Sequence, residues 1–191
     1  TAIAGRPVNL DGVTAHGNTD TGILRDAFAL AGIAEPEWRP RLAEICARMC
    51  GFVEAHRHEF RIRALPMVRD VVSALRGSGR MTGIATGNLE SIGRCKLAAA
   101  GLDDLFDFAA WSDGLEHRAD VFARAVQMAR ARRGEHARIV AVGDTPADIQ
   151  AAHANGLAAV AVATGIYSYE QLQAESPELC IHSFEALTIP A

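Results

Sequence analysis

Residues 138–149 constrain the fold of this chain more than any other stretch. An apolar run ends at Gly143, and Asp144 and Pro146 follow before an amphipathic segment that includes Asp148. The pattern predicts a buried strand, a tight turn and a helix start, because proline fits the first helical turn, where a missing N–H costs nothing. Two carboxylates are therefore expected at the carboxyl edge of a parallel sheet, where open α/β sheets bind ligands.

These two carboxylates have two interpretations. Hard oxygen ligands suit Mg²⁺, which favours one or two carboxylates together with phosphate oxygens and water. Alternatively, Asp144 caps the following helix and Asp148 interacts with its positively polarised N-terminus. The stretch alone leaves both interpretations open.

Hydrophobic periodicity divides the chain into two parts. Up to about residue 63 the periods are helical, with one helix opening at Asp20 and stopping at Gly32 and a second following Pro40. The remainder alternates helices with short apolar segments, which predict strands at 81–86, 106–110, 138–143, 157–163 and 178–182. Such alternation favours right-handed crossovers and a parallel sheet, so we expect an α/β fold over 64–191.

Composition excludes several classes of partner. The chain of 191 residues carries a net charge of −4, with no basic block and few aromatic residues, which argues against binding nucleic acid. No apolar run reaches the length of a membrane span, and no signal-peptide pattern opens the sequence. We therefore expect no nucleic-acid partner and no membrane partner.

The cysteines favour a reducing compartment. Cys46 and Cys50 are one helical turn apart, but no second ligand pair with zinc spacing accompanies them. Buried free thiols in the cytoplasm explain all the cysteines better than a metal site does.

A second polar turn follows the predicted strand at 81–86. Thr86 offers a hydroxyl, Gly87 lets the backbone approach a ligand, and Asn88 can cap the next helix. Together they predict an anion cradle at a helix N-terminus. An ordinary strand-to-helix turn uses the same residue types, so this signal is weak on its own.

Arg118 stands at the start of the helix predicted over 119–132. A cation there opposes the helix dipole unless an anion lies nearby. A phosphate would supply that anion, and a salt bridge to Asp120 or Glu116 is the plain alternative.

The order of these pieces resembles the haloacid dehalogenase-like hydrolase superfamily, in particular its phosphoglycolate phosphatase-like branch. The runs at 86–90, 96–102 and 162–168 resemble that branch as well, and the helical segment opening at Gly17 resembles its cap domain. The resemblance implies a Rossmann-like parallel sheet core over 64–191 and an α-helical cap domain, incomplete at its N-terminus, over 1–63.

The resemblance also implies a magnesium-dependent phosphatase that hydrolyses small phosphate monoesters, phosphoglycolate among them, through an aspartyl-phosphate intermediate. By this analogy Thr86 and the Gly87 backbone hydrogen-bond the phosphoryl group. Arg118 replaces the commoner lysine and neutralises charge, Asp144 binds the metal, and Asp148 binds it directly or through water. These roles agree with the reliance of phosphoryl transfer on positioning and charge stabilisation.

The nucleophile motif of the family, Asp-x-Asp after a first strand, does not occur where the resemblance requires it. Asn9 and Asp11 imitate it, but Gly5, Arg6 and Pro7 precede them where a central strand needs consecutive apolar residues. Asn18 also stands where the branch commonly has arginine, which puts substrate contacts from the cap in doubt.

We therefore expect the first central strand, between the strands at 81–86 and 138–143, to be missing, within a piece of about 30 residues. Residues 1–191 alone should be inactive, and the activity belongs to the intact protein. A relative that binds phosphorylated ligands without catalysis is the alternative. A dehalogenase fits less well because it needs no metal, and no Gly-x-Gly-x-x-Gly supports a dinucleotide-binding module. The central expectation is that Thr86, Arg118 and Asp144 converge on one pocket.

Overall fold

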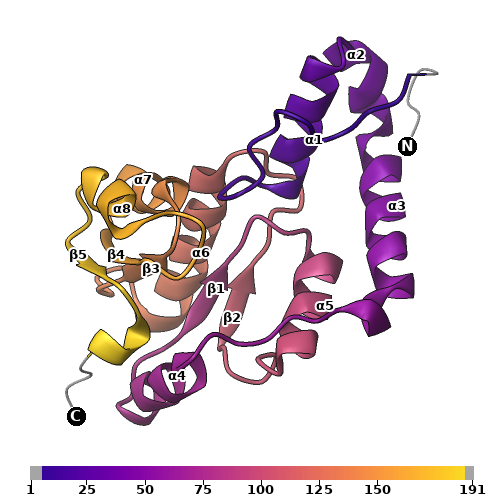
Figure 1. Cartoon of the computed structure of the whole chain (residues 1–191). Coiled ribbons are helices and arrows are strands. Elements are labelled where there is room, and N and C mark those ends of the chain that lie inside the picture. Colours follow the sequence, from indigo (N-terminus) through magenta and orange to yellow (C-terminus); the bar gives the residue numbers. More distant parts are fainter. Residues whose placement is uncertain (1–5, 188–191) are drawn as a thin grey trace.

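The computed structural model describes residues 6–187, and it has an α/β architecture in which the first part of the chain is helical (Figure 1). The helices of this part are α1 (Asp20–Leu30), α2 (Glu35–Trp38) and α3 (Leu42–Ala55), with 3-10 turns at η1 (Arg39–Arg41) and η2 (Arg57–Glu59). Both predicted N-terminal helices are thus confirmed. Among the described residues, no helix is long and apolar enough to cross a membrane.

The N-terminal helices share a small apolar core. Phe28 of α1 packs on Trp38 with ring centroids 5.1 Å apart, and Ile33 and Ile45 complete the buried cluster. Trp38 lies in α2 and not in α3, because Pro40 falls within η1 and separates Trp38 from α3. The tryptophan instead anchors α2 to α1.

Parallel strands and helices alternate through the remainder. The helices are α4 (Val68–Gly77), α5 (Glu90–Ala100), α6 (Arg118–Arg133), α7 (Pro146–Ala154) and α8 (Tyr169–Ala174), followed by the 3-10 turn η3 (Phe184–Ala186). The strands are β1 (Gly83–Ala85), β2 (Phe108–Ala110), β3 (Val140–Gly143), β4 (Ala158–Val162) and β5 (Leu179–Ile181). Each predicted strand is present, and each is shorter than its apolar segment.

The strands form two separate parallel sheets. β1 pairs with β2, whereas β3, β4 and β5 form the second sheet in that order. Helix α6 contacts β1 and β2 and also packs on α7, so it bridges the two sheets (Figure 1).

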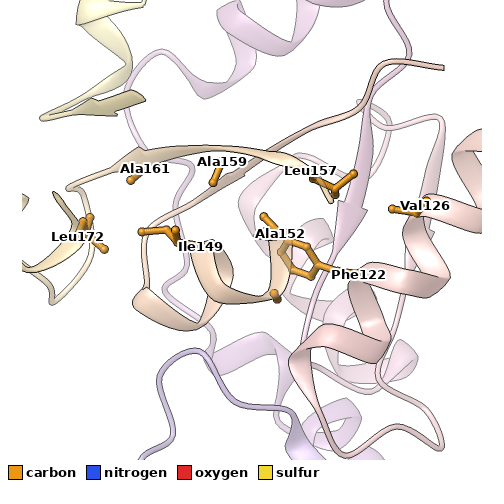
Figure 2. Packing of buried hydrophobic residues seen from close by; sticks show 9 residues of the cluster. Phe122, Val126, Ile149, Ala152, Leu157, Ala159, Ala161 and Leu172 are labelled. Atoms are coloured by element: carbon orange, nitrogen blue, oxygen red, sulfur yellow. The ribbon is translucent and has the colours of Figure 1, made fainter. Parts of the chain in front are cut away.

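The largest apolar core lies between the second sheet and helices α6 and α7. Figure 2 shows Phe122 of α6 beside Ala152 of α7, with Leu157 close to both, and Ala159 of β4 belongs to the same buried cluster. Burial of this cluster fixes α7, and therefore the turn that precedes α7, against β3 and β4.

The edges of β1 and β3 that do not face β2 and β4 lack a strand partner among residues 6–187. One face of β3 is also uncovered, since Val140 is 57% exposed and Val142 is 51% exposed. Valines in a parallel strand are normally buried on both faces.

Candidate functional site

Asp148 organises the turn between β3 and α7. Its Oδ2 atom accepts hydrogen bonds from the backbone N–H groups of Asp144 at 3.3 Å and Thr145 at 3.2 Å, and from the Thr145 hydroxyl at 2.8 Å. The Thr145 hydroxyl in turn accepts from the Asp148 N–H, so Thr145 is the N-cap of α7 and the two residues form a capping box. Asp144 therefore does not cap this helix.

Arg118 is held by the same carboxylate. Its Nε and one terminal nitrogen donate to Asp148 Oδ1 at 3.0 and 2.7 Å, and the side chains of Arg118 and Asp148 are only 19% and 7% exposed. Neither Asp120 nor Glu116, the partners considered from sequence, takes this role. A buried anion therefore explains the cation in the first turn of α6.

Asp144 lies half-buried beside this pair. Burial raises the pKa of the Asp144 carboxyl, and the neighbouring Asp148 carboxylate raises it further, whereas Arg118 and His16 act in the opposite direction. Among residues 6–187, no side chain of another residue donates a hydrogen bond to the Asp144 carboxylate. This carboxylate is therefore available to a ligand.

The turn after β1 is engaged by the N-terminal part of the chain. The Thr86 hydroxyl accepts a hydrogen bond from the Asn88 N–H at 3.3 Å, and the Gly87 carbonyl accepts from the Asp20 N–H at 2.7 Å. A Cβ at Gly87 would lie 2.1 Å from the carbonyl oxygen of Asn18. Glycine is therefore required here, and what approaches it in this structure is a neighbouring backbone.

Asn88 does not cap α5, contrary to the expectation. Leu89 is the N-cap, and the Asn88 side chain instead donates to Asp20 Oδ1 at 3.2 Å and accepts from Lys96 at 3.0 Å. Two N–H groups at the start of α5 are bonded by carboxylates from distant parts of the chain: the Leu89 N–H donates to Asp20 Oδ2 at 2.7 Å, and the Glu90 N–H donates to Asp113 at 2.8 Å. Remote carboxylates replace the local cap.

Asp20 is a site residue that the sequence analysis missed. It is buried, and burial raises the pKa of its carboxyl although Leu89 and Asn88 donate hydrogen bonds to it. In sequence it looks like an acidic residue in the first turn of a helix, and only the folded chain brings it to residues 88 and 89.

Residues 17 and 18 join the two polar turns. A Cβ at Gly17 would lie 2.8 Å from the Thr145 hydroxyl oxygen, and Gly17 also has a φ of +80°, while the next residue, Asn18, touches Gly87. The carboxyl ends of β1 and β3 thus approach the same short segment. No hydrogen bond or ion pair within 6–187 joins Thr86 directly to Arg118 or Asp144, so their convergence stays a prediction.

Helix α1 is tied to the loop that precedes Arg118. The Thr19 hydroxyl donates to the Glu116 carbonyl at 2.9 Å, and the Thr21 hydroxyl donates to the Leu115 carbonyl. The Glu116 carboxylate pairs with Arg39, and this contact lowers its pKa.

The donor set fits Mg²⁺ only in part. Asp144 has a free carboxylate and would hold the ion directly, whereas both Asp148 oxygens already accept hydrogen bonds and suit contact through water. Residues 6–187 contain no group of three or more histidine, cysteine, aspartate or glutamate side chains that could enclose a metal. The cysteines of this part are all free thiols.

Comparison with known proteins identifies a curated relative and several solved structures of similar fold. A curated relative, IndB of Dickeya dadantii, described as a probable phosphatase, is 30% identical over 146 residues. The match covers 72% of this chain but 63% of IndB, so the chain spans less than two thirds of that relative.

Solved structures share the fold. A hydrolase from Pseudomonas syringae is 20% identical, with a TM-score of 0.64 over 88% of this chain and 74% of the hydrolase. A predicted phosphoglycolate phosphatase from Haemophilus somnus is 24% identical, with a TM-score of 0.57 over 85% of this chain and 71% of that protein. Residues 7–156 also match the sequence model of a protein family, the haloacid dehalogenase-like hydrolases. The chain therefore belongs to the haloacid dehalogenase-like hydrolase family.

Proposed function

We propose that these residues form the phosphoryl-binding part of a magnesium-dependent phosphatase that acts on small phosphate monoesters. The observation that carries the proposal is the Asp148 carboxylate, which fixes Arg118 and the backbone of Asp144 together at the carboxyl end of β3. A fixed cation beside a free carboxylate offers what a metal-bound phosphate ester needs: charge neutralisation and a hard oxygen ligand.

Each side chain then has a defined task. Arg118 neutralises charge on the phosphoryl oxygens, and Thr86 with the Gly87 N–H hydrogen-bonds them. Asp144 would hold the Mg²⁺ directly, and Asp148 positions Arg118 and would contact the ion through water. The ion would draw electron density from the phosphoryl group. The N-terminal helices over 1–63 act as a cap that limits entry of water to this edge.

We further propose that the nucleophile comes from a strand inserted between β1 and β3. Its aspartate would attack phosphorus, a second aspartate would protonate the departing alcohol, and water would then hydrolyse the aspartyl phosphate. Support comes from the unpaired edges of β1 and β3 and from the exposure of Val140 and Val142. The length of IndB outside the match leaves room for such a strand.

The test is the hydrolysis of an aryl phosphate with Mg²⁺. Residues 1–191 alone should give no turnover, and any longer product of the same gene should turn over only if an apolar run ending in Asp-x-Asp joins the fold. Turnover by 1–191 that is abolished by Asp11→Asn would contradict the proposal, because it would make Asn9–Asp11 the reacting loop.

A second candidate function is binding of a phosphorylated ligand without hydrolysis. It is favoured because residues 6–187 contain no Asp-x-Asp that could supply the nucleophile and the general acid. A longer product that binds inorganic phosphate with Mg²⁺ but never turns over an ester would support this function.

A further inference from the structure

Two glycines crowd the two carboxylates of the candidate metal site. A Cβ added at Gly165, in the loop after β4, would lie 2.2 Å from Asp144 Oδ2 and 3.1 Å from Asp144 Cγ. A Cβ added at Gly143, the last residue of β3, would lie 2.3 Å from Asp148 Cβ and 2.6 Å from Asp148 Cγ. Each carboxylate therefore packs against a bare backbone on one side.

Backbone conformation does not explain these glycines. Neither Gly143 nor Gly165 has a positive φ, so a side chain could adopt the local backbone geometry without strain. Gly156 shows the opposite case, because it has a φ of +66° and no atom within 4 Å of an added Cβ. Close approach to an aspartate is therefore the feature that separates Gly165 from the ordinary turn glycines.

The two aspartates differ in what else holds them. Asp148 is fixed by Arg118 and Thr145, so its position does not depend on Gly143 alone. The Asp144 side chain accepts no comparable hydrogen bond within residues 6–187, and the Gly165 backbone lies close to its Oδ2.

We propose that Gly165 is a positioning residue for Asp144, and that its missing side chain sets the direction in which the Asp144 carboxylate points. The part of this inference that concerns a divalent cation rests on the proposed function. A methyl group at position 165 would overlap Oδ2 and force the carboxylate to turn, and the neighbouring Asp148 carboxylate repels it as a like charge.

The experiment is a double-mutant cycle between Gly165→Ala and Asp144→Ala, read by thermal unfolding without metal. Gly165→Ala should lower the Tm by about 3–8 °C in the otherwise unchanged chain, as overpacking does. In the Asp144→Ala background the same change should cost less than about 1 °C, since Asp144 Cβ is 3.5 Å from the added atom. Equal losses in both backgrounds would overturn the inference.

A second readout follows the carboxylate directly. Binding of Mn²⁺, measured by electron paramagnetic resonance, should weaken about tenfold in Gly165→Ala, as for other changes that disturb the orientation of a metal ligand. Gly77→Ala is the matched control, because nothing lies within 4 Å of an added Cβ there. If Gly165→Ala leaves the Mn²⁺ affinity unchanged while its loss of Tm still depends on Asp144, then Gly165 has no role in metal binding. If the parent chain does not bind Mn²⁺, the result counts against the proposed function. The double-mutant cycle, which is read without metal, would still show whether Gly165 packs against Asp144.

Discussion

At the scale of single residues, Asp148 connects three parts of the site. Its carboxylate caps α7 together with Thr145, fixes the backbone at Asp144 and receives both donors of Arg118. The structural interpretation made from sequence, a carboxylate near a helix N-terminus, is therefore confirmed for Asp148, whereas its role in a metal and phosphate site stays a prediction. What sequence could not supply was the partner of Arg118, because 30 residues separate the two in the chain.

The Arg118–Asp148 pair should contribute strongly to stability. Arg118→Met keeps most of the side-chain volume but leaves a nearly buried carboxylate without its cation, which should cost about 3 kcal/mol of unfolding free energy. Arg48→Met is the matched control, because Arg48 and Glu44 form an exposed pair on α3 that is worth about 0.5 kcal/mol or less. Urea unfolding of both variants measures the difference, and equal losses would show that the pair is not coupled to the fold.

Asp144 should make stability depend on pH. Burial raises the pKa of its carboxyl, so the folded chain holds this proton more tightly than the unfolded chain does, and stability contributed by the protonated form is lost as pH rises above about 3.8. Asp144→Asn removes this loss. Its unfolding free energy should equal that of the parent at about pH 3, exceed it as pH rises through the folded pKa of Asp144, and keep a constant excess from there to pH 7. A variant less stable than the parent at pH 7 would contradict the sign of the shift.

At the scale of elements, local periodicity predicted which segments are helices and strands, and it failed where distant groups decide. Pro40 ends the helical segment that contains Trp38 before α3 begins. Helix α5 begins without a local side-chain cap, because the carboxylates of Asp20 and Asp113 accept hydrogen bonds from its first N–H groups. Both outcomes depend on contacts between elements that lie far apart in sequence, and no period of 3.6 residues reports them.

The first turn of α1 should be the strongest link between the N-terminal helices and the remainder. Thr19 is fully buried, and its hydroxyl both donates to the Glu116 carbonyl and accepts from the Gly22 N–H. Thr19→Val keeps the shape and leaves both partners unsatisfied, which should cost about 2–3 kcal/mol. Thr14→Val, at an exposed position, should change little. Amide exchange should also quicken at Gly22 in Thr19→Val, and unchanged protection there would refute the link.

At the scale of the whole molecule, the sequence predicted an α/β fold with parallel strands, and this is confirmed. The division into a cap over 1–63 and a core over 64–191 stays a prediction. The resemblance implied one parallel sheet without its first central strand, whereas the structure has two sheets, because strand order depends on which segments are present to fill each position. Because β1 and β3 belong to different sheets, each leaves one edge without a strand partner among residues 6–187.

An unpaired parallel edge next to exposed valines is a template for association with another chain. Residues 1–191 should therefore self-associate as concentration rises, through the edge of β3 that bears Val140 and Val142. Val142→Lys places a charge on this strand and should weaken the association about tenfold, whereas Leu30→Lys, on the exposed side of α1, should not. Sedimentation velocity over a concentration series measures both variants. If the parent chain stays monomeric throughout, or if both lysines act equally, then the edge of β3 is not the associating surface, and the case for a strand inserted beside it loses its main support.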